Sequence, residues 1–367
     1  MNPSGLVRLA AAWGTVAFFL LFGNALLPGA GNPFLASFLF VWLLGVIVWS
    51  AFGVVHEAEE LAELLGEPLG TLILTLAIVI IEVALIAAVM LGAKEAPTLG
   101  RDTMFAVLMI VLNGVVGLGL LIGGQRHHQQ SYNLQGASAY LAVIIPLTVI
   151  SLVLPNFTIS TSDGSLTTLQ AIAFSIFTVA LYAIFLVLQT GRHREFFIYP
   201  IPDGTAAGDD PHVPGHGLGV LPHTLLLLAA ILPIVILSKS LASLLDYGIA
   251  ALGAPQALGG IIIAMIVFTP EGISALRAVA ANELQRAINL CLGAATSTVG
   301  LTVPAVLFIG LLTGQPVILG LSTTNMALLA TTLVLSTLTF SGAKTTVLEG
   351  AVHLLMFFVF LVLVFSP

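Results

Sequence analysis

The sequence predicts an all-α protein that crosses a lipid bilayer about eleven times. Of its 367 residues, 58% are hydrophobic and only 7% are charged, whereas soluble domains carry about 45–50% apolar and about 25% charged residues. The mean hydropathy is +1.12, and the apolar residues gather in long runs. A soluble fold of this length could not bury so much apolar surface, so lipid must be the solvent for much of the chain.

Eleven apolar runs are long enough to cross a hydrocarbon core about 30 Å thick, which needs about 20 helical residues. The first is read as an uncleaved helix, because the apolar core of a signal peptide has only about 7–15 residues. The fifth is short and contains Pro146. The runs cover 7–28, 34–55, 70–92, 103–124, 139–155, 166–189, 222–246, 256–280, 287–312, 317–340 and 346–366.

The basic residues predict the orientation. With the N-terminus inside, seven lie on inner connections (Arg8, Arg126, Arg192, Arg194, Arg277, Arg286 and Lys344) and two on outer ones (Lys94 and Arg101). This bias predicts a multi-pass protein of the bacterial cytoplasmic (inner) membrane, with the N-terminus inside and the C-terminus outside. Lys239 lies within a span and is expected to snorkel or to pair with an acid such as Asp246.

A hydrophilic, proline-rich stretch divides the chain into two halves. Apart from the first span, five spans precede this stretch and five follow it. An odd number of spans per half forces the halves into opposite orientations, as in transporters built from inverted repeats. The expected organisation is an extra N-terminal transmembrane helix at 1–33, a first five-helix repeat at 34–190, a cytoplasmic linker at 191–221 and a second five-helix repeat at 222–367.

One glutamate stands near the middle of the second span of each half. Glu82 follows Gly70 by 12 residues, and Glu271 follows Gly259 by the same number. An ionised carboxylate in mid-bilayer costs several kcal/mol and is usually functional, although a single one could be a protonated packing residue. Equivalent positions of inverted repeats meet near the midplane. Two facing glutamates lose their repulsion when each binds a proton or when they share a cation, so protons and cations compete for the same oxygens.

Further oxygen ligands are available nearby in the sequence. Pro270 has no N–H group and leaves the carbonyl of Ile266 without its helix hydrogen bond. Ca²⁺ takes about six to eight oxygen ligands, and hydroxyl or amide groups near the glutamates could complete such a shell, or could instead make packing contacts between helices. The candidates are Thr75, Asn113, Thr269, Ser274, Thr296, Ser297 and Thr298.

Two other groups of polar residues have a functional and a structural interpretation. Glu349 and His353 are four residues apart, hence on one helix face, and could relay protons or form a packing pair. The stretch from His56 to Glu63 is acidic without Lys or Arg. It could raise the local cation concentration, or be a solvated amphipathic turn.

Composition and motifs exclude several function classes. The net charge of −7 argues against a nucleic-acid partner, and the single cysteine, Cys291, excludes a disulfide framework or a thiolate metal cluster. The absence of paired-His, Ser/Lys or nucleotide-binding motifs argues against the alternative of an intramembrane enzyme. A passive cation channel is the other alternative. No cofactor is expected; the partners are the bilayer, protons and the inorganic cations Ca²⁺, Na⁺ or K⁺.

Several motifs resemble those of the Cha-type bacterial calcium (sodium, potassium)/proton antiporters, within the Ca²⁺:cation antiporter superfamily. The resemblance covers nearly the whole chain. It is carried by Gly66-Glu67-Pro68-Leu69-Gly70-Thr71-Leu72-Ile73-Leu74 running to Glu82, Ala96-Pro97-Thr98-Leu99-Gly100-Arg101-Asp102-Thr103, Pro270-Glu271-Gly272, Gln285-Arg286-Ala287-Ile288-Asn289-Leu290, Leu301-Thr302-Val303-Pro304 and the helix exit from Tyr182 to His193.

This resemblance implies eleven helices, with one extra helix before two inverted halves, and cation/proton exchange by alternating access through Glu82 and Glu271. It also implies a glutamate of the family at the position of Glu349. The sequence departs from many calcium/proton exchangers, which place Gly-Asn four and three residues before each glutamate. Here these positions are Ile78-Val79 and Val267-Phe268, so two amide ligands that bear on Ca²⁺ preference are missing.

Overall fold

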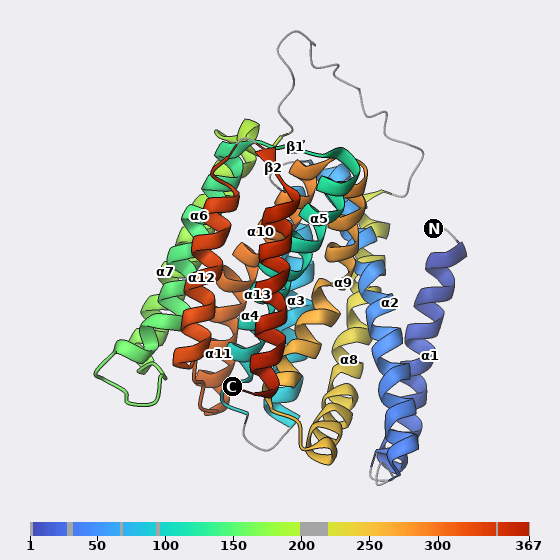
Figure 1. Cartoon of the computed structure of the whole chain (residues 1–367). Helices are drawn as coiled ribbons and strands as arrows, with labels where there is room; N and C mark the ends of the chain where they lie inside the picture. The colour runs from blue at the N-terminus through green and yellow to red at the C-terminus, as the bar shows by residue number, and fades with distance from the viewer. Residues whose placement is uncertain are drawn as a thin grey trace.

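The computed structural model is a bundle of membrane-length helices (Figure 1). It describes residues 3–27, 32–66, 69–92, 96–198, 219–342 and 344–366. Up to the linker the elements are α1 (Pro3–Leu26), α2 (Pro33–Leu65), α3 (Leu69–Gly92), α4 (Leu99–Met109), the π turn η2 (Ile110–Val115), α5 (Val116–His127), β1 (Gln130–Ser131), α6 (Leu134–Thr148), η3 (Val149–Val153), η4 (Leu154–Phe157), α7 (Thr168–Thr190) and η5 (Arg194–Phe197).

After the linker the four elements that follow α1 recur in kind and order, as three helices and a π turn. The elements after the linker are α8 (Val220–Leu252), α9 (Ala257–Ala280), α10 (Leu284–Ser297), the π turn η6 (Thr298–Thr302), α11 (Val303–Thr313), α12 (Thr323–Thr339), β2 (Lys344–Thr345) and α13 (Val347–Phe365). Within the described residues, ten helical segments are long and apolar enough to cross a membrane. The predicted span that is not among these ten is 317–340, which corresponds to α12, a helix of 17 residues. The prediction of an all-α polytopic fold is confirmed.

The two halves match each other in their first elements. Each begins with a helix of 33 residues, α2 or α8, and continues with one of 24 residues that carries the central glutamate, α3 or α9. The next helix in each half contains a π turn, η2 or η6. This recurrence is what two inverted repeats of one ancestral unit would produce.

Several predicted span boundaries are wrong. α2 runs ten residues beyond 55, so the acidic stretch from His56 to Glu63 is helical. The short span at 139–155 is the middle of a longer one, Leu134–Phe157. The span predicted to start at 317 starts at Thr323, because the preceding segment is held by other backbone: the Ile318 N–H donates to the Pro97 carbonyl and the Leu321 N–H to the Leu152 carbonyl. Most of the predicted linker, 199–218, lies outside the described residues.

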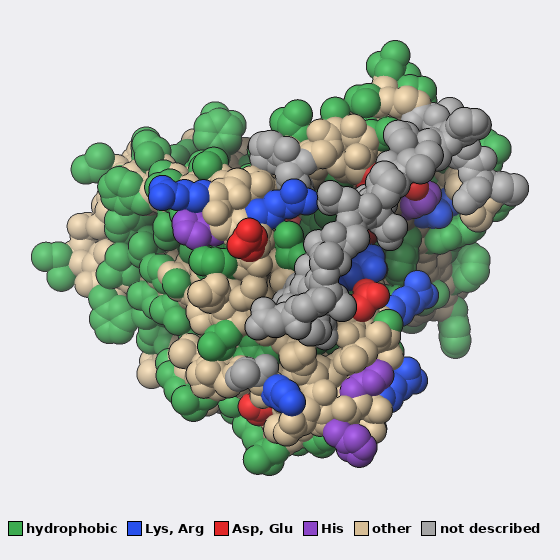
Figure 2. Space-filling model, turned by 90° about the horizontal axis from the view of Figure 1, so that it is seen from above, with side chains coloured by type: hydrophobic (Ala, Val, Ile, Leu, Met, Phe, Trp, Pro, Cys, Tyr) green, Lys and Arg blue, Asp and Glu red, His purple; other side chains and the backbone are tan. Residues whose placement is uncertain are grey.

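The bundle has a linker end and a far end, which differ in the chain segments that meet there. At the linker end α7 finishes and α8 begins; at the far end α8 finishes and α9 begins. Viewed onto the linker end, Figure 2 shows Lys, Arg, Asp, Glu and His side chains gathered across this face, with hydrophobic side chains around its rim. β1 and β2 pair antiparallel and join the two halves here. A charged face bounded by apolar side walls is the pattern of a membrane protein at the water boundary.

The buried apolar side chains form two clusters that meet at α9. One contains Met104, Tyr140 and Leu292 among others, from α4, α6 and α10. The other contains Leu43, Ile86 and Leu241, from α2, α3 and α8. α9 contributes Phe268 to the first cluster and Ile266 to the second. Glu271 therefore stands on the helix that both clusters share.

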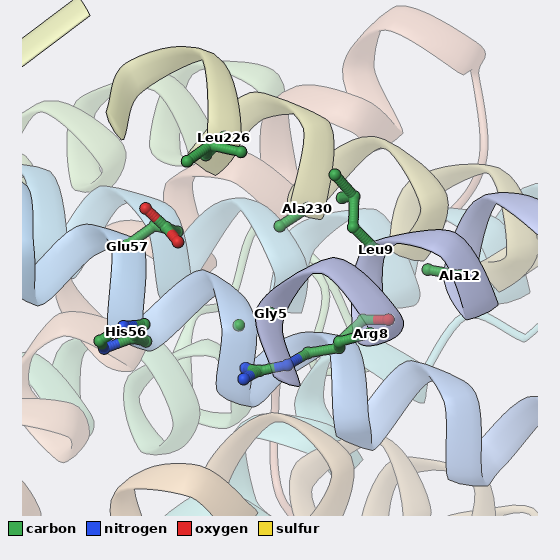
Figure 3. Close-up of a pocket in the computed structure, with 10 residues that line it drawn as sticks. Gly5, Arg8, Leu9, Ala12, His56, Glu57, Leu226 and Ala230 are labelled. Carbon is green, nitrogen blue, oxygen red and sulfur yellow. The ribbon is translucent and has the colours of Figure 1, made fainter. Parts of the chain in front are cut away.

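The extra helix α1 docks on α2 and α8. The Trp13 indole N–H donates to the Ala229 carbonyl on α8, at 3.0 Å. Arg8 extends from α1 alongside α2 and lines a small cavity of about 30 Å³ with His56 and Glu57 (Figure 3). Glu57 in turn contacts His223 of α8, with 2.7 Å between carboxylate and ring nitrogen. These contacts join α1, α2 and α8 into one packed layer.

The contact between α9 and α4 depends on a glycine. A Cβ at Gly260 would lie 2.7 Å from the Thr103 nitrogen and 2.8 Å from the Asp102 carbonyl carbon. Both atoms belong to the backbone and cannot move aside, so any larger residue would push the two helices apart. Gly248 on α8 has nothing within 4 Å of the same position.

We expect Gly260→Ala to destabilise the protein and Gly248→Ala to leave it as stable or slightly more stable. The first creates overpacking that costs about 1–3 kcal/mol, and the second removes the flexibility of a helical glycine, worth about 0.5–1 kcal/mol. Thermal unfolding of the two variants in detergent, followed by size-exclusion chromatography, measures the difference. Equal midpoints for both variants would contradict the close contact of α9 with α4.

Candidate functional site

Glu82 is held on α3 inside the bundle, with 1% of its surface exposed. Its Oε2 accepts two hydrogen bonds from the second half of the chain, one from the Thr298 hydroxyl at 3.1 Å and one from the Thr302 hydroxyl at 2.8 Å. Both donors belong to η6. Among the described residues, Oε1 has no hydrogen-bond partner. One oxygen of this carboxylate is thus oriented by the π turn, and the other is free to bind a proton or a cation.

Glu271 lies on α9 directly after Pro270 and is 8% exposed. Its Oε2 is also without a hydrogen-bond partner in the described part of the chain. Glu82 is near enough to act electrostatically on this carboxylate. The structure therefore brings the two predicted glutamates together, each with a free oxygen.

A cavity of about 380 Å³ reaches Glu271 from the linker end. Two of the predicted ligand candidates, Thr75 and Ser297, line it, and so do polar side chains that the sequence did not single out as ligands. These are Tyr140, Tyr182, Gln189, Thr190, Arg194, Arg286 and Asn289. Glu82 is absent from this lining, so only Glu271 is accessible through this cavity. The bundle is open toward the linker end at one carboxylate and closed at the other.

Three predicted candidates donate their hydroxyl groups elsewhere. The Thr269 hydroxyl donates to the Met265 carbonyl, and the Thr296 hydroxyl to the Leu292 carbonyl at 2.6 Å. Ser297 lines the cavity although its hydroxyl donates to the Ala294 carbonyl, at 3.0 Å. Ser274 is half-buried, one turn after Glu271. Hydroxyl groups engaged with their own helix can still offer lone pairs, but a cation would have to reorient them.

Asn113 and His353 belong to a separate buried network. The Asn113 amide nitrogen donates to the Thr332 hydroxyl at 2.8 Å, and its oxygen lies 3.1 Å from Nδ1 of His353. Because an amide oxygen only accepts, Nδ1 carries the ring proton. Nε2 lies 3.0 Å from the Thr339 hydroxyl. His353 thus ties η2 to α12 and α13.

The second member of the predicted relay has a local structural contact. The Glu349 carboxylate accepts the Thr346 backbone N–H, at 2.6 Å, in a capping box that begins α13. A capping box satisfies backbone groups at the helix start. The proton relay through Glu349 and His353 stays a prediction.

Thr302 is the contact that the sequence analysis missed as a ligand candidate. A signal was available, since Thr298 and Thr302 are four residues apart and therefore share a helix face. The π turns were missed as well. They have no sequence signature as plain as a proline, although they are frequent at functional sites.

The chemistry of the site follows from its donor set. Within the described part of the chain no three His, Cys, Asp or Glu residues come together as a possible metal cluster. A bound cation would therefore have two carboxylates and otherwise neutral oxygens. Such a site suits a hard cation that binds weakly enough to be released, or protons.

Cysteine labelling would test the cavity with two adjacent residues. Ser297 lines the cavity, whereas Thr296 is fully buried. We expect a hydrophilic thiol reagent added at the linker end to modify Ser297→Cys and not Thr296→Cys. The native Cys291 is 2% exposed and provides little background. Absence of labelling in Ser297→Cys would show that water does not reach the site by this route.

Comparison with known proteins agrees with this geometry. The family model described as "Sodium/calcium exchanger protein" matches residues 35–191 and 222–366. The chain is 42% identical over 324 residues to the putative ionic transporter y4hA of Sinorhizobium fredii (strain NBRC 101917 / NGR234), covering 88% of this chain and 87% of that protein. It is 39% identical over 328 residues to the sodium-potassium/proton antiporter ChaA of Escherichia coli (strain K12), with the same coverage.

Solved structures show the same fold. The crystal structure of the selenium-substituted Ca²⁺/H⁺ antiporter protein YfkE superposes with a TM-score of 0.72 at 16% identity, and each chain is fully covered. These relatives are ion transporters by name rather than enzymes. With a family model matched over both halves and two relatives matched along most of its length, the chain belongs to the sodium/calcium exchanger protein family.

Proposed function

We propose that this protein exchanges a cytoplasmic cation for protons by alternating access, with Glu82 and Glu271 binding both. The observation on which the proposal depends is the pair of buried carboxylates, close enough to repel each other and each with a free oxygen. Two negative charges in a membrane interior must be neutralised. Protons and cations can each do this, and they exclude each other because they use the same oxygens.

Charge balance limits the possible exchanges. Two protons neutralise the pair, and so does one Ca²⁺. One Na⁺ or K⁺ together with one proton has the same effect. A cycle in which the site is always neutral when it reorients therefore exchanges one Ca²⁺ for two protons, or one monovalent cation for one proton. Proton flow into the cell would then drive cation export.

The substrates proposed are Na⁺, K⁺ and Ca²⁺. The similarity to an antiporter named for sodium and potassium supports the monovalent cations, and the likeness in fold to a Ca²⁺/H⁺ antiporter is compatible with Ca²⁺. The positions of the missing Gly-Asn pairs are occupied by Ile78-Val79 and Val267-Phe268, all buried and apolar. Ca²⁺ needs about six to eight oxygens, so a site without these amides is better matched to monovalent cations.

The orientation proposed places the linker end in the cytoplasm. Seven basic residues lie on the connections assigned to that side and two on the others, and cytoplasmic connections are enriched in Lys and Arg. In this orientation the cavity at Glu271 opens to the cytoplasm. The division into an N-terminal helix, two five-helix repeats and a cytoplasmic linker belongs to the same proposal.

A passive channel is less compatible with the geometry. The cavity at Glu271 and a large polar cavity at the far end share no lining residue, and Glu82 between them is almost fully buried. A conducting pore needs a continuous path, whereas a transporter is open to one side at a time.

We expect Glu82→Gln and Glu271→Gln to reduce cation/proton exchange to the background rate, because the amide neither releases a proton nor neutralises a cation. Everted vesicles with an acidified lumen and a pH-reporting dye measure the exchange after addition of Na⁺, K⁺ or Ca²⁺. Glu283→Gln is the matched control, since the Glu283 side chain is 54% exposed and its contact is a surface pair with Arg286 at 3.6 Å. Exchange at the wild-type rate by both folded central variants would disprove the assignment.

Coupling distinguishes exchange from leak. We expect cation uptake into vesicles to depend on an opposing proton gradient and to stop when protons are equal on both sides and no cation gradient exists. Uptake of a labelled cation that produces current and ignores the proton gradient would identify a channel. Measuring the flux and the membrane potential together separates these outcomes.

A further inference from the structure

A second large polar cavity lies at the far end of the bundle. Its volume is about 680 Å³, and it is bounded by the last turns of α8, the start of α9 and the start of α4. In Figure 1 this is the lower end, where α8 turns into α9 and where the C-terminus also lies. The deepest lining residue on α3 is Val89, seven residues after Glu82, which corresponds to about 10 Å along the helix. The cavity stops roughly two turns short of the buried glutamate.

Two carboxylates line this cavity, and only one of them has partners. Asp102 accepts the Arg101 guanidinium at 2.8 Å and the Thr98 hydroxyl at 2.9 Å. Asp246 is half-buried on α8, and the structure records no hydrogen bond or ion pair on it among the described residues. The predicted partner Lys239 is exposed and makes no ion pair with Asp246. A half-buried carboxylate that faces an aqueous cavity without a partner attracts cations.

Asp246 has a counterpart at the other end of the bundle. α2 starts at Pro33 and α8 at Val220, each with 33 residues, and Glu59 and Asp246 both stand 26 residues after these starts. Arg286 and Arg101 are likewise both the third residue of the helix after the glutamate helix, α10 and α4. The repeat symmetry therefore relates Glu59 and Arg286 at the linker end to Asp246 and Arg101 at the far end.

Glu59 and Arg286 show how these two residues lie when the cavity at their end of the bundle is open. Glu59 acts electrostatically on both Arg286 and Glu271. Arg286 lines the open cavity, whereas Glu59 is not among the residues that line it. At the far end Arg101 instead contacts Asp102 and the Gly320 carbonyl, and Glu82 is sealed. In inverted repeats the opposite state is reached when the two halves exchange conformations. In that state Asp246 would have the position relative to Glu82 that Glu59 now has relative to Glu271.

We propose that Asp246 is the cation-collecting carboxylate of the far-end cavity, the counterpart of Glu59 at the linker end. It binds hard inorganic cations transiently and delivers them toward the central pair. Residues with side-chain oxygens line the same cavity, namely Thr98, Ser243, Tyr247 and Gln256. This inference rests on the proposed antiport and adds to it a residue that acts on one side of the membrane only.

Sidedness provides the test. Vesicles of both orientations are prepared, and a protease-sensitive tag after the C-terminus reports which population presents the far end. With Na⁺ as the probe at low ionic strength, we expect Asp246→Asn to raise the half-saturating concentration about tenfold when Na⁺ is added at the far end. The half-saturating Na⁺ concentration at the linker end and the maximal rate of exchange should not change. Glu59→Gln should show the reverse asymmetry, and Asp246→Glu should behave as the wild type.

A matched control separates the effect of the carboxylate in the cavity from the effect of negative charge elsewhere on the same face. Asp163 lies in an exposed loop at the same end, and hydrogen bonds from Ser165 hold its pKa below the usual range, so it is ionised at neutral pH. Asp163→Asn removes the same charge from the same face and should leave both half-saturating concentrations unchanged.

The outcomes are distinguishable. Normal transport by Asp246→Asn from the linker end shows that the variant is folded. An unchanged half-saturating concentration at the far end, or an equal change in Asp163→Asn, would overturn the inference while leaving the antiport intact. Absence of exchange in the wild type would instead contradict the proposed function itself.

Discussion

The main physical constraint on the structure is that two carboxylates lie in the interior of a membrane, where their burial costs free energy. Neither Glu82 nor Glu271 has a basic residue as an ion-pair partner in the described chain. An ionised carboxylate without a partner at this depth is strongly unfavourable. The protein reduces this cost with hydroxyl donors on Glu82 and with water access to Glu271. The same solution leaves each carboxylate with one oxygen that a proton or a cation can neutralise.

The two halves give these glutamates unequal environments from equivalent sequence positions. Glu82 is oriented by η6 of the opposite half, whereas η2 directs Asn113 toward Thr332 and His353. Both π turns carry polar side chains that make these contacts, and such turns are frequent at functional sites. The difference between the halves defines which end is open. Exchange of the two environments would open the other end without any new fold.

Much of this arrangement could be predicted from the sequence. Helix number and type follow from apolar run length, and the glutamate pair follows from its equal spacing after Gly70 and Gly259. The start of α12 could not be predicted, because it depends on hydrogen bonds to Pro97 and Leu152, distant in sequence. The donors on Glu82 also depend on which helices meet. A hydrophobic pattern describes one segment at a time and does not show which helices pack together. Thr302 and Glu82 are 220 residues apart in the sequence, so their contact could not be read from such a pattern.

The layer formed by α1, α2 and α8 has a mechanical consequence. A helix of 33 residues is about 50 Å long, whereas the hydrocarbon core is about 30 Å thick, so α2 and α8 must tilt or project into the interface. α1 is fastened to α8 through Trp13 and presents Leu20, Leu21 and Phe22 outward. Hydrophobic mismatch therefore acts directly on the two longest helices. Acyl-chain length is therefore a variable that bears on the tilt of these two helices.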